Sequence, residues 1–366
     1  MTLLPETMRA FVLMGHGGFE QLQYKTDWPT PQPASGEVLI RVHACGLNNT
    51  DVNTRTAWYS KGVEENTTGG AFEGADDEDA TWGGAPLTFP RIQGADVAGE
   101  VVAVGEGTDA SLIGKRAMVE TWIRDWNHPM DLDRIGYFGS ECDGGFAEFC
   151  VVDQRCVHPV ETALSAAELA TFATSYITAE NMLRRASVCA DDVVLVPGAS
   201  GGVGGALIQL AKRRGARVVA LCSPAKRESV AACGPDAILD RSPANLRKAL
   251  REAIGQSTVS VVADVVGGAG WADLIDVIER GGRYTCAGAI AGPMVDFDLR
   301  TFYLRDLTFT GATVVPPGVF ADLVGYIERG EIKPMLAAAY PLEDLHAAQQ
   351  AFIDKRHVGN IVVTCA

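Results

Sequence analysis

Hydrophobic and polar positions alternate in short runs over the first 160 residues of the chain. The runs are separated by Gly and Pro and span residues 9–14, 37–43, 97–104, 116–120 and 146–152. Because successive side chains of a strand point to opposite faces, each run predicts a β-strand with one buried face. Several short strands with turn residues between them predict a compact, barrel-like β domain.

After Ser165 the hydrophobic period becomes helical and continues through Leu183. Ser165 and Glu168 have the spacing of a capping box, which predicts that a helix, and with it a new domain, begins here. Short apolar runs then alternate with helical segments, and the predicted strands cover residues 193–196, 217–222, 237–240, 259–265, 283–287 and 307–311. This alternation is typical of a parallel sheet with helices on both faces.

The chain then returns to mixed elements and ends in an apolar run at 358–364, which predicts a strand that rejoins the first domain. We therefore expect an α/β protein in which a doubly wound parallel sheet is inserted into a β-barrel domain. The expected boundaries are 1–160 for the first part of the barrel domain, 161–312 for the inserted domain and 313–366 for the return.

Composition narrows the class of protein. The net charge of −15 and the pI near 4.9 disfavour nucleic acid and anionic membranes as partners, because both would repel the chain. Nine scattered cysteines, an odd number, indicate reduced thiols and no disulfide framework. The sequence shows neither a secretory signal nor a run of about 18 apolar residues, so we expect a cytoplasmic protein.

A glycine-rich segment joins the predicted strand 193–196 to a helix. Its glycines would let the backbone approach a pyrophosphate, and the free N–H groups at the helix start would hold the negative charge. Strand, loop, helix and next strand occur in the order of a dinucleotide-binding unit. The residues expected to contact the dinucleotide here are Gly198, Ser200, Gly201, Gly202 and Val203.

The end of the strand 217–222 indicates which dinucleotide binds. Enzymes that use NAD usually place Asp or Glu there to accept from the ribose hydroxyls, whereas this chain has Cys222. Ser223, Lys226 and Arg227 follow and favour the 2′-phosphate of NADPH. The alternative is that Lys226 and Arg227 are only solvent-exposed charges in the first turn of the next helix.

Five motifs spread over nearly the whole chain form one combination. They are Cys45-Gly46-Leu47-Asn48 with Asp51, Gly94-Ala95-Asp96-Val97-Ala98-Gly99, the glycine loop, Asp264-Val265-Val266-Gly267-Gly268 and His357-Val358-Gly359. The combination resembles the medium-chain dehydrogenase/reductase superfamily, and within it the zinc-free quinone oxidoreductase-like branch. The resemblance implies a GroES-like catalytic domain, a Rossmann-fold cofactor domain and an active site in the cleft between them. It also implies a homodimer.

The resemblance further indicates that a catalytic zinc is missing. In zinc-dependent alcohol dehydrogenases of this superfamily the metal ligands fall where this chain has Asn48, Ala95 and Thr174. Catalytic zinc needs three N or S donors of the kind that these residues lack, so we predict no metal site. The cysteine quartet of a structural zinc has no counterpart either.

One alternative metal site could be assembled from residues that are far apart in the sequence. It would combine His128, Cys142, Cys150 and His158. Their spacing fits no metal motif, and isolated buried cysteines and exposed histidines are the simpler interpretation.

Without a metal cation, oxidation of an alcohol is disfavoured, because nothing stabilises the alkoxide. Hydride transfer to a conjugated acceptor spreads the arriving charge, so hydrogen-bond donors suffice. We expect Asn48 to donate an amide N–H to the acceptor oxygen and Thr50 to supply a hydroxyl. Tyr59 matches a tyrosine of quinone oxidoreductases and would deliver a proton or orient the substrate. The sequence does not decide whether Tyr59 or solvent supplies the proton.

Other positions follow from the resemblance and from the ends of the predicted strands. Thr178 matches a threonine near the nicotinamide, and small or short residues at the strand ends, Val266, Ala287 and Gly288, leave room for its ring. Asp264 is ambiguous, because it also suits a turn.

Simpler roles stand beside these assignments. Asn48 and Asp51 could cap a turn, Tyr59 could only pack on Trp58, and Thr178 could be an ordinary helical hydroxyl.

The expected function is therefore NADPH-dependent hydride transfer to a quinone or an α,β-unsaturated carbonyl without zinc, with a small molecule as substrate. The alternatives are a zinc-containing alcohol dehydrogenase-like enzyme and a non-catalytic, crystallin-like NADPH-binding protein. Residues 60–84 carry seven acidic side chains and six glycines, so we expect a mobile loop. The sequence leaves open the physiological substrate and whether this loop covers the active site.

Overall fold

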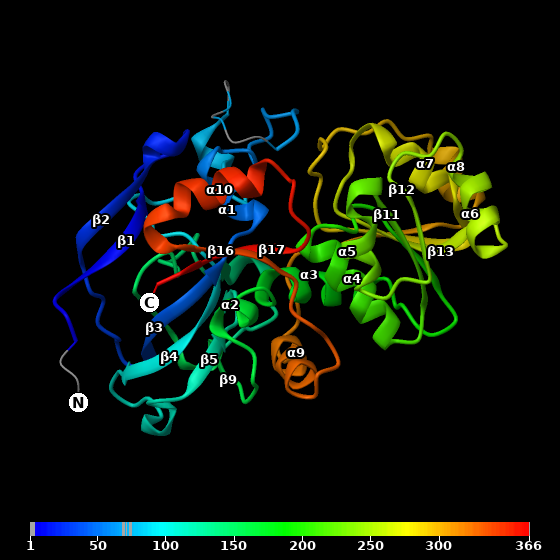
Figure 1. Cartoon of the computed structure of the whole chain (residues 1–366). Coiled ribbons are helices and arrows are strands. Elements are labelled where there is room, and N and C mark those ends of the chain that lie inside the picture. Colours follow the sequence, from blue (N-terminus) through cyan, green and yellow to red (C-terminus); the bar gives the residue numbers. More distant parts are fainter. Residues whose placement is uncertain (1–3, 68–69, 71, 73–74, 366) are drawn as a thin grey trace. The chain divides into compact units, whose positions relative to one another are not determined.

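The computed structural model describes residues 4–67, 70, 72 and 75–365, and its contacts divide the chain into two units (Figure 1). The first unit includes the described chain up to Val63, from Thr67 to Thr174 and from Pro316 onward. The second unit is Ser175–Val315 together with Glu64–Asn66. The main division therefore falls after Thr174, not near residue 160, because the first helix after the capping box packs in the first unit.

The first unit is built on a mainly antiparallel sheet with the strand order β16-β17-β3-β4-β5-β9, and β8 also pairs with β3. β3 is central, and its apolar residues are buried because other strands or helices cover it. The helices of this unit are α1 (Asn49–Arg55), α2 (Ala166–Leu169), α9 (Val319–Glu328) and α10 (Leu345–Ile353). The strands are β1 (Thr7–Leu13), β2 (Leu22–Pro29), β3 (Glu37–Gly46), β4 (Asp96–Val104), β5 (Arg116–Val119), β6 (Trp122–Arg124), β7 (Ile135–Tyr137), β8 (Phe149–Asp153), β9 (Val157–Pro159), β16 (Leu336–Pro341) and β17 (Asn360–Thr364).

The closing strand returns to the first unit, as predicted. β17 pairs antiparallel with β3, and Val363 lies opposite Cys45. Residues near the two ends of the sequence therefore share one sheet and one core.

The second unit holds a six-stranded parallel sheet with the order β12-β11-β10-β13-β14-β15, in which the first strand in sequence lies in the middle. This is the strand order of a Rossmann fold, and the prediction of a doubly wound sheet is confirmed. Its strands are β10 (Val193–Val196), β11 (Arg217–Cys222), β12 (Ala237–Asp240), β13 (Val259–Asp264), β14 (Ile278–Cys286) and β15 (Thr308–Gly311). Its helices are α3 (Ala173–Arg185), which begins at the division, α4 (Gly202–Arg213), α5 (Arg227–Ala231), α6 (Leu246–Ile254), α7 (Trp271–Asp276) and α8 (Leu299–Leu304).

The helical stretch predicted after Ser165 is two helices, α2 and α3. Ser165 caps α2, and its hydroxyl oxygen accepts the backbone N–H of Glu168 at 3.2 Å. The capping box is therefore confirmed, although the continuous helix is not. Among the described residues no helix is long and apolar enough to cross a membrane.

The acidic segment 60–84 is described in part, and residues 68–69, 71 and 73–74 lie outside the described residues. Its described ends are fixed by hydrogen bonds. The hydroxyl of Ser60 accepts the N–H of Asp76 at 2.9 Å, and the carboxylate of Asp79 accepts the N–H of Lys61 at 2.9 Å. The prediction of a mobile loop therefore does not extend to these ends.

Candidate functional site

The polar corner after β3 is the start of α1. Asn48 is extended at the N-cap of this helix, and the carboxylate of Asp51 accepts the backbone N–H of Asn48 at 2.7 Å. The capping role considered for these two residues is therefore present. Gly46, just before the corner, has no room for a side chain, because an added Cβ would lie 2.2 Å from the carbonyl oxygen of Ala170.

Asp96, the first residue of β4, is the centre of the polar cluster. Its Oδ1 accepts both the backbone N–H of Thr174, at 2.9 Å, and the hydroxyl of Thr174. The side-chain amide of Asn48 lies next to the same carboxyl group, and its hydrogen-bonding effect lowers the pKa of Asp96. Asn48 and Thr174, two of the three positions where zinc-dependent relatives hold metal, thus meet at a buried carboxyl group.

Tyr137, at the end of β7, extends this cluster, and the sequence analysis missed it. Its hydroxyl lies 2.7 Å from the hydroxyl of Thr174. Its ring packs edge-on against Trp122, at 5.2 Å between centroids, and Trp122 packs in the same way against Trp82 at 5.1 Å. No motif in the irregular stretch 122–142 indicates this residue, because only the tertiary structure brings it to Thr174. Trp82 shows that the end of the acidic segment lies against the same aromatic group.

Two carboxyl groups share this buried environment. Burial raises the pKa of Asp51 to about 7. The hydrogen bond from the N–H of Asn48 lowers this pKa, whereas the nearby charge of Asp96 raises it. Burial also raises the pKa of Asp96 to about 6, although the hydrogen bonds from Thr174 oppose the change. A neutral carboxylic acid is therefore accessible here close to neutral pH, and it can donate a proton.

Thr50 is the second residue of α1, and the structure brings the Tyr59 hydroxyl next to the side chain of Thr50. Burial raises the pKa of the Tyr59 hydroxyl, and the side chains of Thr50 and Asn53 next to it lower the pKa. The ring also packs edge-on against Trp58, at 5.6 Å between centroids, so the packing role is present too. The hydroxyl is held in its protonated form, which is the form that can donate.

The residues at the former metal positions do not fit a catalytic zinc. Asn48, Ala95 and Thr174 offer an amide, a methyl group and a hydroxyl, and none replaces a thiolate or an imidazole. No group of three His, Cys, Asp or Glu side chains among the described residues is arranged to hold a metal ion.

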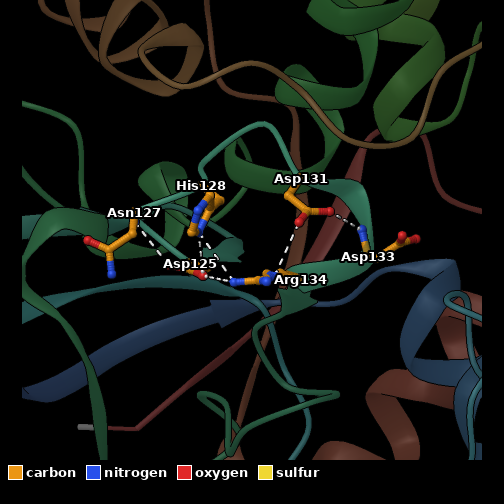
Figure 2. A network of polar contacts seen from close by, with 6 residues as sticks. All are labelled: Asp125, Asn127, His128, Asp131, Asp133 and Arg134. Atoms are coloured by element: carbon orange, nitrogen blue, oxygen red, sulfur yellow. Dashed lines mark hydrogen bonds and ion pairs between the residues drawn. The ribbon is translucent and has the colours of Figure 1, made fainter.

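The alternative metal set does not assemble either, because its histidines have other partners. Figure 2 shows His128 and Arg134 on the carboxylate of Asp125, at 3.1 Å and 2.7 Å. These hydrogen bonds, with the largest effect from Arg134, lower the pKa of Asp125 to about 2. His158 lies 3.4 Å from the carboxylate of Glu120.

The glycine loop has the geometry expected for a pyrophosphate site. Gly198 has a φ of +64°, which only glycine adopts readily, and it makes the turn after β10. A Cβ on Gly204 would lie 2.3 Å from the carbonyl oxygen of Gly198, so this glycine is needed for close packing of α4 on the loop. Gly201, the N-cap of α4, has no such contact, since the nearest atom would be 3.6 Å from its Cβ. The backbone is therefore open on the side of Gly201, as a closely approaching ligand requires.

The other residues expected at the dinucleotide lie on the same unit. Ser200 is in the turn, Gly202 and Val203 begin α4, and Thr178 is half-buried on α3. Val266 contacts the glycine loop, because a Cβ on Gly198 would lie 2.8 Å from its side chain.

The ends of β13 and β14 lie next to each other. Asp264 stabilises the turn after β13, because its Oδ1 accepts the N–H of Val266 at 2.7 Å. It also bonds to the neighbouring strand β14, because its Oδ2 accepts the hydroxyl of Tyr284 at 2.9 Å. Ala287 donates its N–H to the carbonyl of Asp264 at 3.2 Å, and Gly288 follows. These bonds fix the strand ends where nicotinamide was expected.

The basic residues after β11 differ in their surroundings. Ser223 begins the turn, and Lys226 is half-buried, with its pKa lowered by burial and by the nearby charge of Arg241. The guanidinium of Arg227 is bonded to the carbonyl of Ile238. Asp240, the last residue of β12, lies beside Cys222 in the sheet, and Arg241 follows Asp240 directly. The pairing of β11 with β12 therefore brings Arg241 near Lys226. The sequence analysis missed Arg241.

The second unit has the strand order and the glycine loop of a dinucleotide-binding domain. The first unit is a β domain that holds a buried acid, an amide and hydroxyls. Together these features define a two-domain dehydrogenase or reductase. The profile of the alcohol dehydrogenase GroES-like domain matches residues 34–162, and that of a zinc-binding dehydrogenase matches residues 202–329. The chain belongs to the medium-chain dehydrogenase/reductase superfamily and is an oxidoreductase of that superfamily.

Three similar proteins illustrate its range. The chain is 26% identical to quinone oxidoreductase of Rattus norvegicus over 94% of each chain. It is also 26% identical to acryloyl-coenzyme A reductase of Metallosphaera sedula, over 98% of this chain and all of the other. A solved structure from Sinorhizobium meliloti 1021, provisionally assigned as an alcohol dehydrogenase, is 44% identical, covers 99% of this chain and 97% of its own, and has a TM-score of 0.89.

Proposed function

We propose that this oxidoreductase uses NADPH to reduce a quinone or an α,β-unsaturated carbonyl, and that it does so without zinc. The observation that carries the proposal is the replacement of the metal ligands by a hydrogen-bonded group of neutral donors and a carboxyl, Asn48, Thr174 and Asp96. Such donors stabilise the charge that hydride transfer places on a conjugated oxygen. The quinone oxidoreductase and acryloyl-coenzyme A reductase relatives support the same class of acceptor.

In this proposal NADPH supplies the hydride, and the chain holds its pyrophosphate at the glycine loop. Gly198 and Gly204 shape the loop, and Gly201 leaves its open side to the ligand. Ser223 and Lys226 hold the 2′-phosphate, with Arg241 as a second cation nearby. Asn48, Thr50 and Tyr59 are proposed to bind or protonate the acceptor.

The direct test is NADPH consumption by the purified protein with a panel of quinones and enones, followed by absorbance. Turnover with one of them and no stoichiometric zinc in protein purified without chelator would support the proposal. Tight NADPH binding with no turnover on any acceptor would favour a non-catalytic NADPH-binding protein. Stoichiometric zinc with oxidation of alcohols would favour the zinc-dependent alternative.

The preference for NADPH over NADH has its own test. The guanidinium of Arg227 is bonded to the carbonyl of Ile238, whereas Lys226 is the side chain proposed to hold the 2′-phosphate. Lys226→Ala should weaken NADPH by about 10-fold or more and leave NADH unchanged, because a charged contact to phosphate contributes about 1.5 to 3 kcal/mol. Arg227→Ala is the matched control and should have a smaller effect, since the carbonyl of Ile238 already holds its guanidinium. Dissociation constants from nicotinamide fluorescence measure both. An equal loss of NADH and NADPH in Lys226→Ala would refute the phosphate contact.

A homodimer is also part of the proposal. In the part of the chain that the structure describes, β15 pairs only with β14 and forms one edge of the sheet. Large apolar side chains that precede it in the sequence are exposed. These are Met294, Val295, Leu299, Tyr303 and Leu304. An exposed apolar group next to a free sheet edge favours association with a second copy.

A further inference from the structure

An exposed carboxylate lies next to the position at which a Rossmann sheet selects its dinucleotide. That position is Cys222, the last residue of β11, because enzymes that use NAD place there an acid that accepts from the ribose hydroxyls. Asp240, the last residue of β12, is paired with Cys222 in the parallel sheet. The acid that β11 lacks is therefore present one strand away, at the same end of the sheet.

The side chains of these two residues are close to each other. Paired residues of neighbouring strands point to the same face of a sheet, and the strands lie about 4.8 Å apart. Burial raises the pKa of the Cys222 thiol, and the negative charge of Asp240 raises it further. Cys222 is buried, whereas Asp240 is exposed to solvent. The carboxylate is therefore accessible to a ribose hydroxyl at the end of β11.

The Asp240 carboxylate is held in place and keeps acceptor capacity. Its Oδ1 accepts the backbone N–H of Ser242 at 3.0 Å, which stabilises the turn after β12. A carboxylate has about four acceptor positions on its two oxygens, so this hydrogen bond leaves others for a ligand. The turn itself needs only one acceptor oxygen, and an amide side chain supplies one as well as a carboxylate does.

The cations proposed for the 2′-phosphate lie around the same strand ends. Lys226 is half-buried, and burial, followed by the positive charge of Arg241, lowers the pKa of its ammonium group. Arg241 is exposed and follows Asp240 directly. One acid and two cations therefore lie near the end of β11. The cations suit a 2′-phosphate, whereas the acid suits a free 2′-hydroxyl.

We propose that the protein also binds NADH, and that Asp240 is the specificity-determining residue that accepts from its ribose hydroxyls. Lys226 and Arg241 hold the 2′-phosphate of NADPH, and the carboxylate of Asp240 repels this phosphate because both are negative. Asp240 therefore reduces the preference for NADPH that the two cations produce. The inference rests on the proposed function, which places a dinucleotide at the glycine loop, and it adds a second reductant.

Dissociation constants for NADH and NADPH, measured by nicotinamide fluorescence, test this role in Asp240→Asn. Asparagine keeps one oxygen for the N–H of Ser242, but it loses the charge and the second acceptor oxygen. The constant for NADH should rise by about 10-fold, because hydrogen bonds to a charged group are strong. The constant for NADPH should stay the same or fall, because a repulsion is removed. An equal rise for both dinucleotides, or no rise for NADH, would overturn the assignment.

Glu228→Gln is the matched control, since it removes an exposed acid from the first turn of α5 in the same unit. It should leave both dissociation constants unchanged. If it shifts them as Asp240→Asn does, the effect is one of general charge, and the assignment fails.

Asp240→Ala separates the carboxylate from the turn, because it removes both the charge and the acceptor of the Ser242 N–H. If only the turn matters, Asp240→Asn binds NADH like wild type and Asp240→Ala alone loses affinity, which would also overturn the assignment. Adenosine 5′-monophosphate and adenosine 2′,5′-bisphosphate, used as competitors of NADPH, place the contact at the ribose. Asp240→Asn should weaken the first and not the second, and an equal effect on both would count against Asp240.

These outcomes are distinct from failure of the proposed function. A wild-type protein that binds neither dinucleotide refutes the cofactor site, and with it the role of Asp240. A wild-type protein that binds NADPH but shows no binding of NADH at millimolar concentration refutes only the role of Asp240. If wild type binds both dinucleotides and reduces no quinone or enone, the proposed reaction is refuted, whereas the dissociation constants of Asp240→Asn still decide the role of Asp240.

Discussion

The buried Asp51 carboxyl should make the stability of the first unit depend on pH. Its pKa is raised from 3.8 to about 7, chiefly by burial. Between these values the folded chain holds a proton that the unfolded chain releases. The free energy of unfolding therefore decreases as the pH rises through this range, and the contribution of this group no longer changes with pH below about pH 4 or well above pH 7.

Asp51→Asn removes this dependence and keeps a side-chain oxygen that can accept the N–H of Asn48. Each pH unit well inside the range corresponds to about 1.4 kcal/mol, and the slope falls as the folded group begins to ionise near pH 7, so wild type should lose about 2 kcal/mol between pH 5 and 7 through this group. The variant should lose none of it. The stability of Asp51→Asn relative to wild type should therefore increase by about 2 kcal/mol over these two pH units.

Urea unfolding followed by tryptophan fluorescence measures this difference. Five of the six tryptophans, all except Trp271, lie in the first unit, so the signal reports mainly on that unit. Asp27→Asn, an exposed change on β2, is the matched control and should follow wild type at every pH. The reasoning is refuted if Asp51→Asn keeps the same pH dependence as wild type and the control.

Three other predictions follow from packing. Gly204→Ala should lower the melting temperature, because its Cβ would lie 2.3 Å from a carbonyl oxygen, whereas Gly201→Ala should keep the melting temperature and lose dinucleotide affinity; equal thermal shifts in the two variants would contradict this. Arg55→Met should cost about 3 kcal/mol in urea unfolding, since the fully buried guanidinium donates to the carbonyl of Gly17 at 2.9 Å and lies over a phenylalanine ring, and a loss under about 1 kcal/mol would count against it. Leu299→Glu with Leu304→Glu should convert a dimer to a monomer in light scattering, and a monomeric wild type would dismiss the proposed interface.

Much of the fold could be predicted because its signals are local. The strands at 193–196, 217–222 and 237–240 are predicted with the bounds that the structure gives them, since buried parallel strands are short apolar runs between turns. The glycine loop is predicted for the same reason, because positive φ and close backbone approach restrict which residue can stand there. Segments without a strong period, such as β2 and α1, were not predicted.

The candidate site depended on contacts that no local pattern records. Asn48, Asp96, Tyr137 and Thr174 come from four separate segments, and the sequence marked only the first and last as former metal positions. Whether a buried carboxyl is neutral depends on which groups surround it and how many donors reach each oxygen. Sequence alone determined the chain's periodicity, its turns and the lack of zinc-type donors at three positions. Tertiary structure decided the partners of Asp96, because hydrogen bonds between distant residues form only when folding brings their atoms within about 3 Å.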